Sequence, residues 1–113
     1  MPTVALLSFR LGGDDGVAVV ARTWADAFRA FGFDVTTVAG SGAVDRTVPG
    51  LELGAAAPPE AADVDAALAA ADLVVVENLL TIPMNLPAST VVAGALRGRP
   101  AILHHHDPPW QRP

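Results

Sequence analysis

The chain has 113 residues, about one domain's worth, and its formal net charge is −5, from 7 basic and 12 acidic residues. Lys and Arg form no cluster that could neutralise a nucleic-acid backbone, so we expect no nucleic-acid partner. Cysteine is absent, which excludes disulfides and thiolate metal sites and favours a cytoplasmic localisation. Lysine is also absent, which excludes a P-loop, a protein kinase and a Schiff-base enzyme.

Apolar runs alternate with segments of helical periodicity along the whole chain. We predict strands at 4–8, 33–39, 72–77 and 101–105, with a short additional strand at 47–48 or 51–53. We predict helices at 17–31, 60–71 and 88–97. Gly32 should end the first helix as a left-handed cap, and Gly40, Ser41 and Gly42 should break the second strand. This order predicts an α/β fold, a doubly wound parallel sheet of about four or five strands with flanking helices.

The first predicted helix has two faces of different character. Its apolar side chains recur at helical spacing: Val17, Val20, Ala21, Trp24, Phe28 and Phe31. The other face carries three charged residues, Arg22, Asp26 and Arg29. Hydrophobic residues make up 51% of the sequence, although no apolar run reaches the roughly 20 residues that a membrane span needs. A partner surface that covers apolar residues would explain this composition.

Polar and glycine residues follow three of the predicted strands, where parallel sheets place their sites. After the first strand come Gly12, Gly13, Asp14 and Asp15, but Leu11 replaces the first glycine of a dinucleotide fingerprint. The aspartates would also repel a pyrophosphate at the helix terminus. Two interpretations stay open. The segment is a tight turn with a capped helix, or the glycines admit another group while the aspartates accept hydrogen bonds from sugar hydroxyls.

The ends of two later strands carry the other candidate residues. Glu77 and Asn78 either join neighbouring loops by hydrogen bonds or include a general base, because a carboxylate at the end of an apolar strand needs a partner. All three histidines lie in the run from His104 to His106, followed by Asp107. A metal site, a metal-free polar site and structural histidines are the alternatives there. Trp110 suits stacking on a sugar ring or packing against another domain.

Three segments together resemble the amino-terminal domain of family 4 retaining glycosyltransferases, which have the GT-B fold. The first runs from Arg10–Leu11–Gly12–Gly13 through a helix to Phe31–Gly32–Phe33–Asp34–Val35. The second is the strand from Ala71 to Asn78, and the third runs from Arg99 to Trp110 through the His–Asp pair. The resemblance extends over essentially the whole chain and implies one Rossmann-like half of such an enzyme.

The resemblance implies a transfer of sugar, with retention, from a nucleotide-sugar donor to a sugar or lipid-linked acceptor. It implies that Gly12 and Gly13 bind the donor and that His106 and Asp107 are catalytic. The acceptor would meet Asp14, Asp15, Glu77, Asn78 and Trp110. No cofactor beyond the nucleotide-sugar co-substrate and no metal are expected.

The family's basic pair and paired glutamates belong to a carboxyl-terminal domain. We therefore expect residues 1–113 to be a partial amino-terminal domain, inactive alone, whose full enzyme can touch a membrane peripherally. A non-catalytic α/β binding module or split subunit is the main alternative, and a His/Asp metal-dependent hydrolase fragment is another. A phosphoacceptor receiver domain is excluded, because the lysine that it needs is missing.

Overall fold

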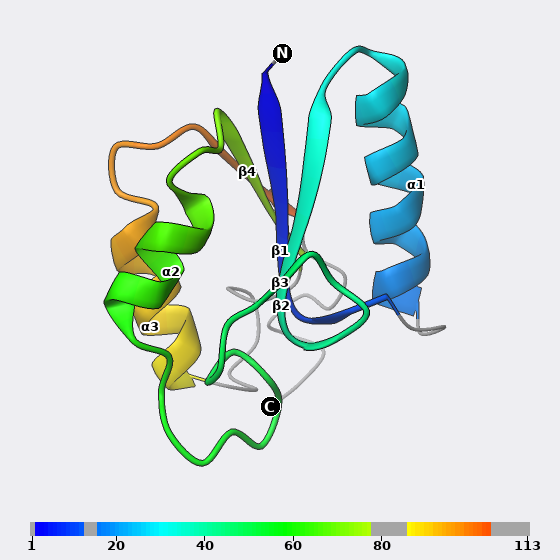
Figure 1. The fold of residues 1–113 in the computed structure, drawn as a ribbon. Helices are drawn as coiled ribbons and strands as arrows, with labels where there is room; N and C mark the ends of the chain where they lie inside the picture. Colours follow the sequence, from blue (N-terminus) through cyan, green and yellow to red (C-terminus); the bar gives the residue numbers. More distant parts are fainter. Residues whose placement is uncertain (1, 13–15, 78–85, 105–113) are drawn as a thin grey trace.

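The computed structural model describes residues 2–12, 16–77 and 86–104. These residues form a parallel sheet of five strands with helices on both faces (Figure 1). The elements in chain order are β1 (Thr3–Leu11), α1 (Gly16–Ala30), β2 (Asp34–Gly42), β3 (Arg46–Thr47), α2 (Ala61–Leu68), β4 (Leu73–Glu77), α3 (Leu86–Ala95) and β5 (Ala101–His104). The predicted doubly wound α/β fold is thereby confirmed, and the short third strand falls at the first of its two candidate positions.

The strands lie in the order β3-β2-β1-β4-β5, with β1 at the centre. β1 pairs with β2 along its whole length and with β4 from Val4 to Leu7. The chain moves outward from β1 through α1 to β2, and outward in the other direction from β4 through α3 to β5. The direction of winding therefore reverses between β1 and β4, and this is the point where open α/β sheets form their crevice.

Each face of the sheet has its own apolar core, because strand side chains point alternately to the two faces. α1 covers one face, while α2 and α3 lie together on the other (Figure 1). The core under α1 includes Val4, Leu6, Leu11, Ala21, Ala25, Ala39 and Val75. The core under α2 and α3 includes Leu7, Phe9, Val38, Leu51, Val64, Leu68, Val76 and Val92. Burial of these side chains on both faces explains why β1 and β4 read as continuous apolar runs.

α1 ends in a Schellman motif, which explains one departure from the sequence prediction. Gly32 has φ +93°, its N–H donates to the carbonyl of Arg29 at 3.0 Å, and the N–H of Phe33 donates to Phe28 at 3.0 Å. The rings of Phe28 and Phe33 also meet edge to face, with centroids 5.5 Å apart. Phe31 was expected on the apolar face of the helix, but its side chain is 84% exposed. The reason is that Phe31 is the last residue before the chain reverses at Gly32.

The second departure concerns β2, which does not break at Gly40. It continues to Gly42, and Arg10 and Leu11 of β1 pair with Ser41 and Gly42. Gly40 is needed for a different reason, because a Cβ there would collide with the backbone of Glu52. The glycine therefore allows the chain after β3 to cross closely over β2.

The edge of the sheet opposite the candidate site is fixed by short hydrogen bonds. The N–H of Thr3 donates to the Asp72 carboxylate and the N–H of Asp72 donates to the Thr3 carbonyl, both at 2.8 Å. Arg99 donates from Nη1 to the carbonyl of Leu68 at 2.9 Å, which satisfies a carbonyl at the end of α2. No helix within the described ranges is long and apolar enough to cross a membrane.

Candidate functional site

The carboxyl ends of β1, β4 and β5 lie side by side, because these strands are neighbours in a parallel sheet. Gly12 directly follows β1, Glu77 is the last residue of β4 and His104 is the last residue of β5. Glu77 and His104 are register partners on adjacent strands. Three segments that are far apart in sequence thus reach one edge of the sheet, at the point where its winding reverses.

Ser8 and Glu77 are the two buried polar residues among the described side chains. The Ser8 hydroxyl donates a hydrogen bond of 2.8 Å to the main-chain carbonyl of Glu77. The Glu77 side chain is completely buried, and no buried side-chain nitrogen or oxygen in the described segments lacks a hydrogen-bond partner. Glu77 is therefore held in place as a buried carboxylate requires, while its contact with an acceptor stays a prediction.

Gly12 is exposed and has φ +81°, a conformation that side chains other than glycine rarely adopt. A Cβ at this position would collide with the backbone of Ala43, in the loop that follows β2. A Cβ on Gly42 would likewise collide with the carbonyl oxygen of Leu11. The ends of β1 and β2 therefore approach so closely that both positions require glycine. The group that approaches the backbone of Gly12 in the folded chain is Ala43, and the contact of Gly12 with a donor stays a prediction.

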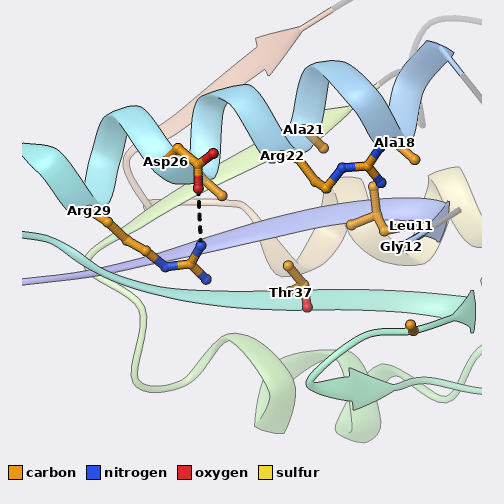
Figure 2. A pocket seen from close by; sticks show the side chains of 10 residues that line it. Leu11, Gly12, Ala18, Ala21, Arg22, Asp26, Arg29 and Thr37 are labelled. Atoms are coloured by element: carbon orange, nitrogen blue, oxygen red, sulfur yellow. Dashed lines mark ion pairs between the residues drawn. The ribbon is translucent and has the colours of Figure 1, made fainter. Parts of the chain in front are cut away.

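A groove opens beside Gly12 and runs between α1 and β2 (Figure 2). Its volume is about 340 Å³, within the usual size range of small-molecule pockets. Leu11 and small side chains of α1, such as Ala21, form its apolar part, and Thr37 of β2 also lines it. Three charged side chains of α1 complete the lining: Arg22, Asp26 and Arg29.

These three charged residues were predicted only to lie on the face of the helix opposite its apolar side chains, and the groove was not predicted. One available signal was the spacing of Arg22 and Arg29, which are seven residues apart and so lie on one side of a helix, next to alanines at 18, 21 and 25. A groove needs a second wall, however. That wall comes from β2 and the loop at Ala43, which helical periodicity does not reveal.

The loop at Ala43 is fastened to β2 by Asp45 and Thr37. The Asp45 carboxylate accepts hydrogen bonds from the Thr37 N–H at 2.9 Å and from the Thr37 hydroxyl at 3.2 Å. The N–H of Asp45 donates to the Thr37 hydroxyl oxygen at 2.9 Å. Thr37 also lines the groove, so these bonds hold one of its walls in position.

Two of the predicted site residues, Gly12 and Glu77, fall within the described segments, and both lie at the carboxyl edge of the sheet. The others lie outside the described residues: Gly13, Asp14, Asp15, Asn78, His106, Asp107 and Trp110. The metal alternative rested on His104, His106 and Asp107, so it falls mostly outside them as well. Among the described residues, no three His, Cys, Asp or Glu side chains are grouped in a way that could hold a metal ion.

None of the protein families, curated proteins or solved structures with which the chain was compared matches it. The architecture is a doubly wound parallel sheet with helices on both faces, and its winding reverses between β1 and β4. The described residues therefore form an α/β domain of the Rossmann-like type.

Proposed function

We propose that this chain is the acceptor-side, amino-terminal part of a GT-B glycosyltransferase that acts in the cytoplasm. The observation that supports the proposal is the arrangement of β1, β4 and β5. These strands carry the three segments on which the family resemblance rests, they are neighbours in the sheet, and their carboxyl ends lie at one edge. A cleft enzyme of this type needs its polar groups at such an edge.

In this proposal the chain binds and orients the acceptor sugar, and a second domain or partner chain holds the nucleotide-sugar. The acidic charge balance supports this division of roles. With 12 acidic and 7 basic residues, the chain is poorly suited to stabilise a leaving diphosphate by itself. Carboxylates such as Asp14 and Asp15 are instead good acceptors for hydrogen bonds from sugar hydroxyls.

The strand-end residues would then have separate tasks. Gly12 and Gly13 form the wall next to the donor, and His106 with Asp107 approaches the sugar that is transferred. Asn78 and Trp110 bind the acceptor, the first through its amide and the second by stacking on a sugar ring. Glu77 supports this edge from the interior of the fold, because its side chain is buried at the end of β4. Its main-chain carbonyl accepts a hydrogen bond from the Ser8 hydroxyl.

Sugar binding by the isolated chain tests the proposal. We expect saturation-transfer NMR to show contacts with one class of monosaccharide or lipid-linked sugar in the absence of any nucleotide. Trp110→Ala should remove these contacts, and Arg97→Gln should retain them, because Arg97 is exposed and follows α3 on the side away from the edge. Equal binding by the two variants, or binding to free nucleotide alone, would contradict an acceptor-side role.

A non-catalytic partner module is the second candidate, and the exposure of β5 favours it. β5 is an outer strand of the described sheet, and its side chains Ile102 and Leu103 are 38% and 47% exposed. Successive residues of a strand point to opposite faces, so apolar surface is exposed on both sides of this edge. A second domain or partner chain would cover it.

A further inference from the structure

The outer side of α1 carries an exposed row of small and apolar side chains. Among the described helices, α1 alone covers its face of the sheet, and its outer side is directed away from the strands (Figure 1). Four residues at intervals of four form this row, which we call the α1 row: Val19, Thr23, Ala27 and Phe31. All four are exposed, Val19 by 45% and Phe31 by 84%. Side chains at this spacing form the ridges through which helices pack against one another.

The α1 row can be covered without leaving a polar side chain unpaired. The hydroxyl of Thr23 donates to the carbonyl of Val19 at 3.2 Å, one turn earlier in the helix, so this donor stays bonded when the row is buried. Ala27 and the neighbouring Ala30 are both exposed and short, which allows a second helix to approach to about 8 Å between the axes. Phe31 adds an aromatic ring, the kind of side chain that contributes most to interfaces. The row is therefore suited to contact with another helix.

The charged side chains beside the row favour a second copy of this chain as the partner. Within one chain, Nη1 of Arg29 lies 3.7 Å from the carboxylate of Asp26, and the two side chains are 54% and 81% exposed. Exposed pairs of this kind contribute little to stability, typically below about 1 kcal/mol, so the two groups can change partners at low cost. Asp26 and Arg29 also lie symmetrically about the point between Ala27 and Phe28. When two copies of α1 pack antiparallel about a two-fold axis at that point, each Asp26 lies opposite the Arg29 of the other copy.

The same axis places the third exposed charge of α1 favourably. Arg22 then lies just beyond the carboxyl end of the other copy's helix, where the helix dipole favours a cation. A two-fold axis through Asp26 itself would instead bring two carboxylates together. The charges beside the row are thus complementary to a second copy in one antiparallel register.

We propose that the α1 row is the interface of a homodimer, in which two copies of this chain pack antiparallel through α1. The two copies of Ala27 meet at the centre, and each Phe31 packs near Thr23 of the other copy. Asp26 and Arg29 form two reciprocal ion pairs at the rim, which set the register, while the apolar row supplies the affinity. The interface lies on the outer side of the helix, away from the carboxyl edge of the sheet, so it does not depend on the proposed sugar transfer.

The absence of cysteine from the sequence allows a direct test of this register. Ala27→Cys places one thiol of each copy beside its counterpart, so oxidised glutathione should link this variant into a covalent dimer. Ala66→Cys, at an exposed alanine of α2, is the matched control and should be linked much more slowly. Adding Ile102→Thr and Leu103→Thr to Ala27→Cys should leave the linking unchanged, because these two residues lie on β5.

Charge exchange between the copies gives a second test. Asp26→Arg brings two guanidinium groups together at each rim contact, and Arg29→Asp brings two carboxylates together, so each variant should dimerise more weakly than the parent. In an equimolar mixture of the two variants, every charge again faces its opposite, and a heterodimer should form. Size-exclusion chromatography with light scattering measures this recovery. Loss of the pair within one helix would weaken each variant equally, alone and in the mixture.

The apolar part of the interface is tested by Phe31→Ser, which should raise the dissociation constant of the dimer about tenfold or more. Leu53→Ser, at a 44% exposed residue in the loop between β3 and α2, is the control and should leave it unchanged. Sedimentation equilibrium at about 0.15 M salt measures both constants, since each copy carries a net charge of −5 that opposes association at low ionic strength. The proposal is overturned if the parent chain stays monomeric at the concentrations used for NMR, if Ala27→Cys is linked no faster than Ala66→Cys, or if the mixture of charge variants shows no recovery.

Discussion

The hydroxyl of Ser8 is bonded at 2.8 Å to the carbonyl of Glu77, and this joins β1 to β4 at the level where β4 ends. β1 continues for three more residues, from Phe9 to Leu11, alongside β2. At the carboxyl edge of the sheet, β1 therefore extends three residues beyond the level at which β4 ends. The buried hydroxyl of Ser8 satisfies the main-chain carbonyl of Glu77 at this position.

Ser8→Ala should therefore destabilise the fold. The variant leaves a buried carbonyl without its hydroxyl donor, which typically costs about 1–3 kcal/mol. Urea denaturation followed by circular dichroism measures the change. Thr23→Ala is the matched control, because Thr23 donates at 3.2 Å to Val19 on an exposed turn of α1, and we expect a change below about 0.5 kcal/mol there. Equal losses in the two variants would contradict the role given to Ser8.

Gly12→Ala should destabilise the fold more than Gly54→Ala. Both glycines have positive φ, +81° and +72°, so both substitutions carry the same kind of backbone strain, about 1–2 kcal/mol. A Cβ on Gly54 meets open space, whereas a Cβ on Gly12 meets the backbone of Ala43. The larger loss expected for Gly12→Ala therefore reflects the close approach of Ala43. A difference near zero would show that the loop at Ala43 moves aside freely.

Asp45 and Thr37 should be energetically coupled. Asp45→Ala removes a carboxylate that accepts two hydrogen bonds, and Thr37→Val removes the hydroxyl that takes part in two. In a double-mutant cycle we expect a coupling of about 0.5–1.5 kcal/mol in the free energy of unfolding. If the effects of the two substitutions on the free energy of unfolding simply add, the hydrogen bonds between Thr37 and Asp45 do not stabilise the loop at Ala43.

Ile102→Thr combined with Leu103→Thr should reduce association and leave the fold intact. Each side chain is more than half buried, but threonine keeps the β-branched shape that strands favour, so we expect the sheet to form. Size-exclusion chromatography with light scattering measures association, and thermal unfolding serves as the check on folding. If the parent chain is a monomer at all accessible concentrations and the variant behaves identically, β5 is not a surface for a second copy.

His106→Ala tests the proposed sugar transfer in an enzyme completed by its nucleotide-binding domain. If this histidine approaches the transferred sugar, we expect a loss of turnover of about 10²- to 10⁴-fold, typical for a positioned polar group near a transition state. His105→Ala, one position earlier in the same run, is the natural comparison. Normal turnover of His106→Ala would remove the assigned role.

The order of elements was predictable because each signal was local. Apolar runs marked β1 and β4, which are buried on both faces, and Gly32 marked the end of α1. The extension of β2 was not predictable, because the reason for Gly40 lies in its contact with Glu52, twelve residues later. The sequence likewise offered two positions for the short third strand, and only pairing with Val38 and Ala39 selects Arg46–Thr47.

The candidate site shows the same division between local and distant causes. Strand ends could be predicted, so Gly12 and Glu77 were expected at the carboxyl edge, and they lie there. The burial of Glu77 and its link to Ser8 depend on two strands that are 69 residues apart in sequence. The groove depends on α1, β2 and the loop at Ala43 together. The periodicity of a single helix or strand does not predict which other elements will pack against it.

The close approach of Gly12 and Ala43 connects the strand edge with the groove between α1 and β2, since Gly12 stands at that edge and also lines the groove. A ligand that moved Ala43 would act next to Gly12, where an added Cβ would already collide with the Ala43 backbone. By thermodynamic linkage, whatever factor such a ligand imposes on affinity at the edge, a ligand at the edge imposes on the groove. If the groove and the strand edge are linked in this way, the close approach of Gly12 and Ala43 is where one would act on the other.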